Sequence, residues 1–224
     1  MRWVVLVSLL LLTACGRPLS PAEKAFARQV HGESIAVNRI RFHDGALVGS
    51  VTLERQKRPR LTCRERILPE PKSEKITVSP AAVALFNRVF YAKDWYAEDY
   101  LPDYPNRMSL VHAMLFAHEI THVWQWQNRA QTGYSPLRSA AEHTRSDDPY
   151  LFDIATKARF LDYGYEQQAS IVEEYVCCAA LDPTAPRTKR IAAMLSEAFP
   201  LGTLYIPPEV TLPWDGVEAR GICR

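Results

Sequence analysis

Three segments of the chain carry apolar residues at helical spacing and contain neither proline nor glycine. They are residues 108–128, 165–181 and 187–199, and the last two are followed by Asp182-Pro183 and by Pro200. This spacing predicts three helices, and the prolines mark where two of them end.

The sequence before residue 108 is richer in residues that favour strands. Residues 35–42 and 46–53 flank His43-Asp44-Gly45 and together predict a β-hairpin. Residues 75–79 predict a further strand, whereas residues 80–91 begin like a helix and continue like a strand. The expected fold class is therefore α+β, with a small, mostly antiparallel sheet upstream of the long helices.

The segments between these elements predict loops. Residues 95–105 mix aromatic and acidic side chains, residues 134–148 are polar, and the tail beyond residue 200 is rich in proline. No internal repeat and no linker divides the sequence, so residues 22–224 are expected to form one domain.

The first residues have the pattern of an export signal. Arg2 precedes an apolar run that is too short to span a bilayer. The Leu-Thr-Ala-Cys sequence that ends at Cys15 resembles the lipobox of bacterial lipoproteins. The resemblance implies a signal peptide at residues 1–14, a lipid on the Cys15 sulfur and, from Gly16, retention at the outer membrane. Residues 15–21 are then expected to be a tether, with the protein in the bacterial cell envelope, facing the periplasm.

The composition is that of a globular protein with a core. Of 224 residues, 47% are apolar, and 27 basic residues nearly balance 25 acidic ones. The resulting net charge of +2 argues against a dedicated nucleic-acid binder, so no nucleic-acid partner is expected.

Four cysteines follow Cys15, an even number that suits an oxidising compartment. Cys177 and Cys178 are adjacent within a predicted helix, where their side chains point about 100° apart and can pair with two different segments. Cys63 and Cys223 are the available partners. Two disulfides are expected, and the sequence leaves their pairing open.

Residues 118–122 read His-Glu-Ile-Thr-His within the longest predicted helix. Four residues cover about 400° of a helix, so His118 and His122 project from one face and can chelate one zinc ion. Glu119 lies about 100° away, where it can address a water molecule without binding the ion. A catalytic zinc needs a third protein ligand, and no further histidine follows on this helix. Acidic candidates lie in the next predicted helix: Glu166, Glu173 and Glu174.

The segments HEITHVWQWQ and YEQQAS together resemble the gluzincin group of zinc metallopeptidases, especially the short HExxHxxQ domains of bacterial exported and secretion-associated proteins. The resemblance covers residues 107–178. It implies a zincin-like fold in which an active-site helix packs against a second, ligand-bearing helix. It also places Glu166 in the ligand position, so the implied zinc ligands are His118, His122 and Glu166.

The sequence departs from this pattern at Ser170, where many gluzincins have an aspartate that hydrogen-bonds a ligand histidine. Ser170 is expected to take that role as a weaker acceptor. Glu173 is the alternative third ligand, because it lies about 700° further along the helix and near the face of Glu166.

The resemblance implies a zinc-dependent metallopeptidase in which Glu119 is the general base for a zinc-activated water. Candidates for a further donor to the oxyanion are Tyr163, Tyr165, Tyr175 and His143, although His143 in a polar segment is more typical of a solvated side chain.

The expected partners are a peptide or protein substrate, the membrane through the lipid anchor, and an unidentified secretion-system or envelope component. Two other functions compete with the metallopeptidase. One is an inactive zincin-fold scaffold or binding lipoprotein, which the departure at Ser170 favours, and the other is a cell-wall peptide amidase.

Overall fold

The computed structural model describes residues 16–45, 52–157 and 159–224. The expected signal peptide at residues 1–14, the lipidation site Cys15 and residues 46–51 of the expected hairpin lie outside the described residues. Within the described ranges, no helix combines the length and apolarity of a bilayer-spanning segment.

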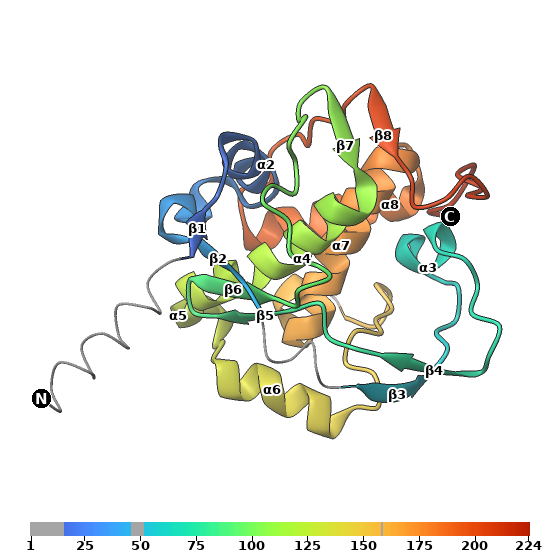
Figure 1. Cartoon of the computed structure of the whole chain (residues 1–224), viewed down its shortest axis with the longest axis horizontal. Helices are drawn as coiled ribbons and strands as arrows, with labels where there is room; N and C mark the ends of the chain where they lie inside the picture. Colours follow the sequence, from blue (N-terminus) through green and yellow to red (C-terminus); the bar gives the residue numbers. More distant parts are fainter. Residues whose placement is uncertain (1–15, 46–51, 158) are drawn as a thin grey trace, which may run out of the picture.

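Two long helices pack against each other at the centre of the molecule, α4 (Leu110–Gln127) and α7 (Tyr165–Leu181) (Figure 1). Apolar residues lie on most sides of both helices, and a helix of this kind is stable only when it is buried all round. Phe116 and Trp124 of α4 and Ile171 of α7 are fully buried in the core that results. The apolar spacing therefore predicted both helices correctly.

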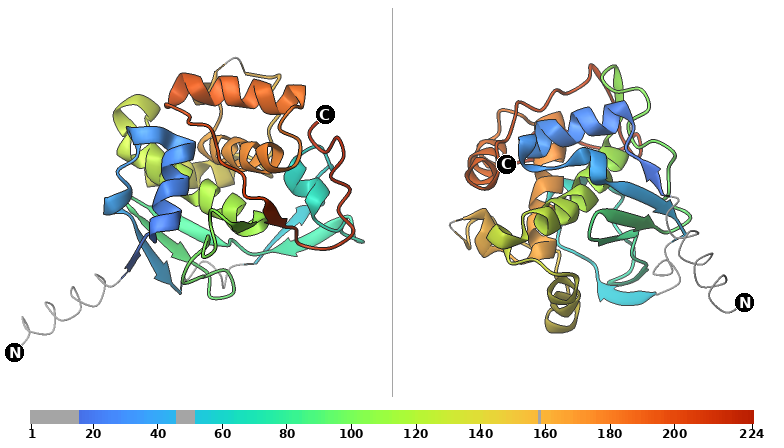
Figure 2. Two further views of the ribbon diagram at one scale, coloured as in Figure 1. Left: turned by 90° about the horizontal axis from the view of Figure 1, so that it is seen from above. Right: turned by 90° about the vertical axis from the view of Figure 1, so that its left-hand side faces the viewer.

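The other helices surround this pair. Seen from above, α8 (Pro186–Ala198), α7 and α4 form successive layers with the strands below them (Figure 2). α2 (Pro21–His31) packs on α4 and begins with a reciprocal cap, in which Ser20 and Glu23 each accept the backbone N–H of the other. The shorter helices are α3 (Cys63–Ile67), α5 (Arg129–Thr132), α6 (Pro136–Arg145) and the 3₁₀ turns Gly32–Ser34, Val37–Arg39 and Phe160–Asp162.

The strands form three small sheets, which together with the helices give the α+β class. The largest has the order β1-β2-β6-β5, comprising Arg17–Pro18, Arg41–Asp44, Arg88–Tyr91 and Ala82–Leu85. The two-stranded sheets pair β3 (Leu53–Gln56) with β4 (Lys75–Val78), and β7 (Arg107–Ser109) with β8 (Glu209–Thr211). Because β2 pairs with β6 in parallel, the main sheet is mixed rather than purely antiparallel.

The hairpin expected around His43-Asp44-Gly45 is wrong. β2 and β3 belong to different sheets, and β2 pairs instead with β1 and β6. The hairpin of the main sheet is β5–β6, whose tight turn places Phe86 at a positive φ of 60°. The ambiguous segment 80–91 therefore contains two strands and no helix.

The first described residues belong to the folded body. Arg17 and Pro18 pair with β2, and Leu19 is buried. The Arg17 guanidinium donates to both carboxylate oxygens of the fully buried Glu23, each at 2.8 Å. Because Ser20 caps α2 and Pro21 begins it, the interpretation of residues 15–21 as a tether is wrong for residues 17–21.

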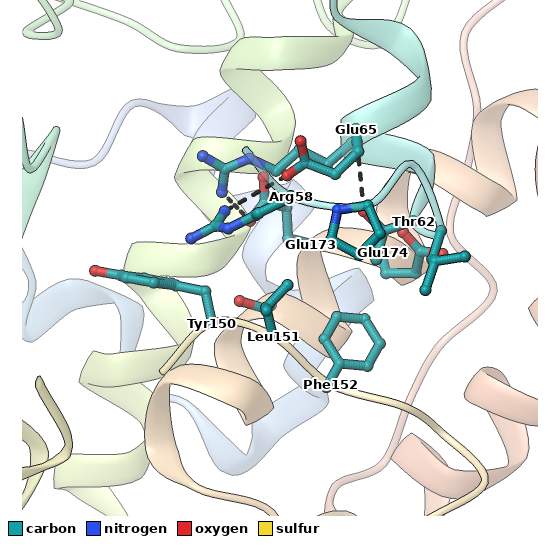
Figure 3. A pocket seen from close by; sticks show the side chains of 12 residues that line it. Arg58, Thr62, Glu65, Tyr150, Leu151, Phe152, Glu173 and Glu174 are labelled. Atoms are coloured by element: carbon teal, nitrogen blue, oxygen red, sulfur yellow. Dashed lines mark hydrogen bonds and ion pairs between the residues drawn. The ribbon is translucent and has the colours of Figure 1, made fainter. Parts of the chain in front are cut away.

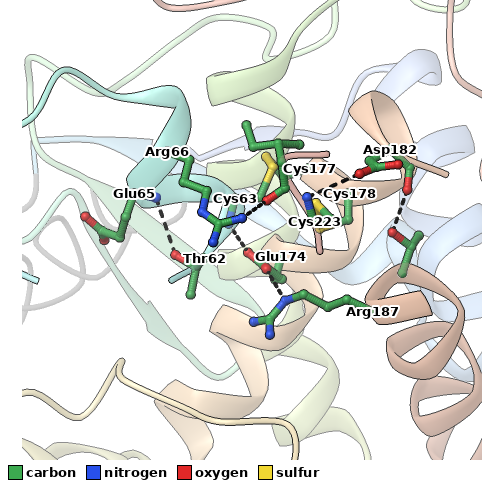
Figure 4. The surroundings of a disulfide bond; sticks show 12 residues. Thr62, Cys63, Glu65, Arg66, Glu174, Cys177, Cys178, Asp182, Arg187 and Cys223 are labelled. Carbon is green, nitrogen blue, oxygen red and sulfur yellow. Dashed lines mark hydrogen bonds and ion pairs between the residues drawn. A yellow bond between two sulfur atoms is a disulfide. The ribbon is translucent and has the colours of Figure 1, made fainter. Parts of the chain in front are cut away.

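Two disulfides meet on one turn of α7. Cys177 is bonded to Cys63 of α3, and Cys178 is bonded to Cys223 near the C-terminus (Figure 4). Each of the two adjacent cysteines thus holds a different distant segment against the same helix.

Residues 134–148 do not form the expected loop but contain α6. Ser135 caps this helix by accepting the N–H of Arg138, and Pro136 occupies its first turn. The helix was missed because its sequence has no apolar stripe, and Ser139 is its one buried residue.

Candidate metal centre

Three side chains from α4 and α7 converge on one buried point. One turn of α4 separates His118 from His122, and the first turn of α7 carries Glu166. The Oε2 atom of Glu166 lies 3.4 Å from Nε2 of His118 and 3.2 Å from Nε2 of His122. Each of the three residues is only 5–6% exposed. The structure thus brings together the three ligands that the sequence resemblance implied.

The donor set suits a zinc ion. Two imidazole nitrogens and a carboxylate oxygen are the protein ligands of one common type of catalytic zinc site. Apart from these two imidazoles, no donor among the described residues approaches the buried Oε2 atom of Glu166, although a buried carboxylate oxygen needs a donor or a cation. Among the described residues, the other potential metal cluster consists of Cys63, Cys178 and Cys223, whose sulfurs are committed to disulfides.

Each histidine is oriented through its second ring nitrogen. Nδ1 of His118 lies 3.2 Å from Oε2 of Glu173, and Nδ1 of His122 lies 2.9 Å from Oε1 of Gln125. Gln125 is itself fixed, because its amide donates to Gln168 and to the carbonyl of Tyr165. Such contacts set the ring orientation and leave Nε2 free to face the metal.

The role expected for Ser170 is therefore wrong. Its hydroxyl is buried without a hydrogen-bond partner, whereas Glu173 holds His118. Glu173 is not brought to the ligand position either, since its carboxylate meets the Nδ1 side of the ring. A carboxylate is a stronger acceptor than a hydroxyl, so Glu173 supplies the electrostatic support that Ser170 could not.

Glu173 is in turn held by α3. Arg64 donates to its Oε2 atom at 3.1 Å, and Glu173 borders a pocket of about 40 Å³ between α3 and α7 (Figure 3). The Arg58 guanidinium, which also lines this pocket, pairs with Asp148 and lies 5.1 Å from the ring centre of Tyr150. These contacts fix residues 148–150, and Tyr150 of this segment also lines the pocket at the metal centre.

The electrostatics favour positive charge between the histidines and Glu166. Burial opposes the imidazolium form of His118, but the hydrogen bonds to Glu166 and Glu173 outweigh it and raise the pKa to about 10. Burial likewise opposes charge on Glu166, yet His122 and His118 hold its pKa well below the usual range. A divalent cation at this point would provide the positive charge that these groups favour.

Glu119 differs from the other buried acids of the centre because burial dominates its titration and raises its pKa. It is 5% exposed and follows His118 on α4. A carboxyl of raised pKa next to a metal site is suited to accept a proton from water near neutral pH.

A pocket of about 360 Å³ opens in front of the two histidines and Glu119. Its walls come from β5, which is an edge strand of the main sheet, from α6, and from two aromatic side chains, Tyr134 and Tyr150. The Tyr150 ring centre lies 5.8 Å from that of His118 and 5.6 Å from that of His143.

The oxyanion donors proposed from sequence are distributed differently in space. Of Tyr163, Tyr165, Tyr175 and His143, only His143 lines this pocket, and its Nε2 atom lies 3.2 Å from Glu166. The Tyr163 hydroxyl is occupied elsewhere, by the carbonyl of Asp153. Tyr134 and Tyr150 were missed because they lie in irregular segments whose path no local pattern reveals.

These features define an α+β domain with a buried centre of two histidines and one glutamate that opens to a pocket of about 360 Å³. No family model matches the chain. One curated protein similar to it is the type VI secretion system spike protein VgrG2b of Pseudomonas aeruginosa, 25% identical over 187 residues. The match covers 84% of this chain but only 15% of the length of the spike protein.

Among solved structures, the effector domain of Pseudomonas aeruginosa VgrG2b matches with a TM-score of 0.51 and 23% sequence identity. The match covers 82% of this chain and 83% of that domain. The two therefore share a fold over most of their length.

The comparisons correct the family and the function expected from the sequence. Both of these matches are to VgrG2b, the solved one being its effector domain, and neither names a gluzincin metallopeptidase. The assignment as an envelope-anchored zinc metallopeptidase lipoprotein is therefore wrong. The scaffold lipoprotein and the cell-wall amidase fit the relatives no better.

Proposed function

We propose that this chain is an effector-type domain whose chemistry depends on a zinc ion held by His118, His122 and Glu166. The observation that carries the proposal is the convergence of three buried ligand atoms within 4.8 Å of one another. The packing of α4 on α7 supports a zincin-like arrangement of the centre. The likeness to the VgrG2b effector domain supports a role beside a type VI secretion component.

The reaction that best suits the centre is hydrolysis of an amide or ester carbonyl. A bound zinc ion would lower the pKa of a water ligand to roughly 7 and polarise the carbonyl. Glu119 would accept the proton of the attacking water, because its buried carboxyl has a raised pKa. Glu173 and Gln125 keep the two imidazoles in place through Nδ1. Tyr134 and Tyr150 narrow the pocket and shield the reacting groups from bulk water.

The proposal is tested by zinc content and turnover measured on the same samples. Purified protein should contain about one zinc per chain, and His118→Ala should lose it. Glu119→Gln should retain the zinc and lose hydrolysis of a panel of fluorogenic peptides and esters. Glu218→Gln, which removes an exposed carboxylate, serves as the matched control and should behave like the wild type. A wild-type protein that binds no zinc, or a Glu119→Gln variant as active as the wild type, would refute the proposal.

A further inference from the structure

Helix α6 contributes little to the core, yet it borders the metal centre. Leu137 on this helix is 84% exposed, and the residues that face α7 are the polar Ser139, Glu142 and His143, of which the His143 side chain is still 38% exposed. A helix normally turns its apolar face toward the protein, so this arrangement needs another explanation. All three of these side chains end on the first turn of α7.

Glu142 caps α7 from outside that helix. Its Oε1 atom accepts the N–H of Tyr165 at 2.8 Å, and its Oε2 atom accepts the N–H of Glu166 at 3.1 Å. The N-cap residue of α7 is Gly164, which has no side chain to satisfy these donors. A Cβ atom at Gly164 would lie only 3.0 Å from Oε1 of Glu142, so the glycine permits this close approach. A carboxylate is also the charge that a helix N-terminus favours.

The two carboxylate oxygens of Glu166 have different surroundings. Oε1 accepts from Nε2 of His143 at 3.2 Å and lies at the limit of hydrogen bonding, 3.5 Å, from the hydroxyl of Ser139. Oε2 is buried, and its polar neighbours are the Nε2 atoms of His118 and His122, the other two proposed ligands. One oxygen is thus occupied by α6, while the other is left for a cation.

We propose that α6 positions the third metal ligand, Glu166, through Glu142 and His143, an inference that rests on the proposed zinc function. These two residues are called the clasp below. Glu142 fixes the backbone at Glu166, and His143 holds Oε1. Glu166 then offers zinc only Oε2. A carboxylate that binds through one oxygen leaves room in the coordination sphere for the water that a catalytic site needs.

The test uses the full chain, zinc and cobalt(II). Zinc affinity is measured by competition with a chromophoric chelator, and the coordination number is followed by the visible absorption of bound cobalt. His143→Leu should weaken zinc binding about 10-fold, the lower end of what loss of a ligand-orienting partner costs. Its cobalt form should absorb more weakly, because a released Glu166 can bind through both oxygens and raise the coordination number.

Two further substitutions separate the hydrogen bond from the bulk of the side chain. His143→Gln should restore zinc affinity and the cobalt spectrum, since its amide N–H can donate to Oε1 of Glu166. Glu142→Ala should weaken zinc binding as well. Glu142→Gln, which keeps one acceptor oxygen, takes its place if the alanine variant does not fold. Thr144→Ala, on the exposed side of α6, is the matched control and should leave both readouts unchanged.

The outcomes distinguish the clasp from the zinc function. Wild-type affinity and spectrum in both His143→Leu and the Glu142 variant would overturn the clasp while leaving the zinc function intact. Failure of His143→Gln to rescue a weakened His143→Leu would overturn the hydrogen bond to Oε1 as its basis. A wild-type chain that binds neither ion would overturn the proposed function and the clasp together.

Discussion

The two disulfides allow a matched pair of perturbations. Cys63–Cys177 closes a sequence separation of 114 residues and Cys178–Cys223 one of 45, and the two loops follow each other without overlap. With these separations, the chain-entropy relation gives about 4.8 and about 4.0 kcal/mol for the two bonds at 25 °C. Replacing either pair by alanine should therefore lower the free energy of unfolding by similar amounts.

The same two variants should differ sharply in zinc affinity. Cys63–Cys177 anchors α3, from which Arg64 reaches Oε2 of Glu173, and this oxygen also contacts Nδ1 of His118. Without the disulfide, Arg64 is no longer fixed, Glu173 is free to turn from His118, and zinc should bind about 10-fold more weakly. Cys178–Cys223 holds the C-terminal tail, which meets α3 through hydrogen bonds from Arg66 to the carbonyl of Ile222 and from Trp214 to the carbonyl of Ile67. Among the described residues, none of the hydrogen bonds of the tail involves Arg64, Glu173 or His118.

Urea unfolding of the apo proteins measures the stability of each variant, and chelator competition measures zinc affinity under native conditions. An Arg64→Met variant, which keeps both disulfides, should reproduce the loss of zinc affinity with little loss of stability. Equal zinc affinity in the two double-alanine variants, together with wild-type affinity in Arg64→Met, would refute the path from α3 to His118.

Three further predictions concern α4 and the helix α2 that packs on it. Burial lowers the pKa of His31 to about 3. Between pH about 6.5 and pH about 3, the unfolded chain therefore binds a proton that the folded chain excludes. The free energy of unfolding should therefore fall by up to about 1.4 kcal/mol per unit as pH decreases through this window, and His31→Gln should flatten that part of the curve measured by urea unfolding. Gln125→Leu removes the acceptor for Nδ1 of His122 and should weaken zinc binding about 10- to 100-fold. Gln125→Glu keeps an acceptor and should bind zinc like the wild type. Equal zinc affinities of the two variants in chelator competition would contradict this prediction. Trp124→Ala empties a fully buried site and should cost about 3–5 kcal/mol in the same unfolding assay, and a loss below about 1 kcal/mol would contradict its place in the core.

The parts of the fold that follow from local periodicity were predictable. The sequences of α4 and α7 repeat apolar residues at the helical period, and Asp182-Pro183 marks the end of the second. The partners of β2 were not predictable, because its pairing with β6 joins strands that are distant in the chain. The polar segment that became α6 carries only the cap and proline of Ser135-Pro136 as a signal of helix.

The candidate site likewise has a part that the local sequence predicts and a part that only the tertiary packing determines. The spacing of His118 and His122 is a local property of a helix, and the sequence alone puts both imidazoles on one face. The seven-residue separation of Glu166 and Glu173 also puts them near one face, but it cannot say which carboxylate meets Nε2 and which meets Nδ1. That choice depends on how α7 crosses α4, which the packed structure supplies.

The meeting of both disulfides on Cys177 and Cys178 has a consequence for chemical mapping. Trypsin has no cleavage site between these two residues, so a digest of the non-reduced protein should yield one species of three joined peptides, LTCR, FLDYGYEQQASIVEEYVCCAALDPTAPR and GICR. The exchanged pairing, Cys63 with Cys178 and Cys177 with Cys223, would give a species of identical mass. Gas-phase cleavage of the peptide bond between the two cysteines therefore distinguishes the pairings, since it leaves LTCR attached to the Cys177 fragment and GICR to the Cys178 fragment.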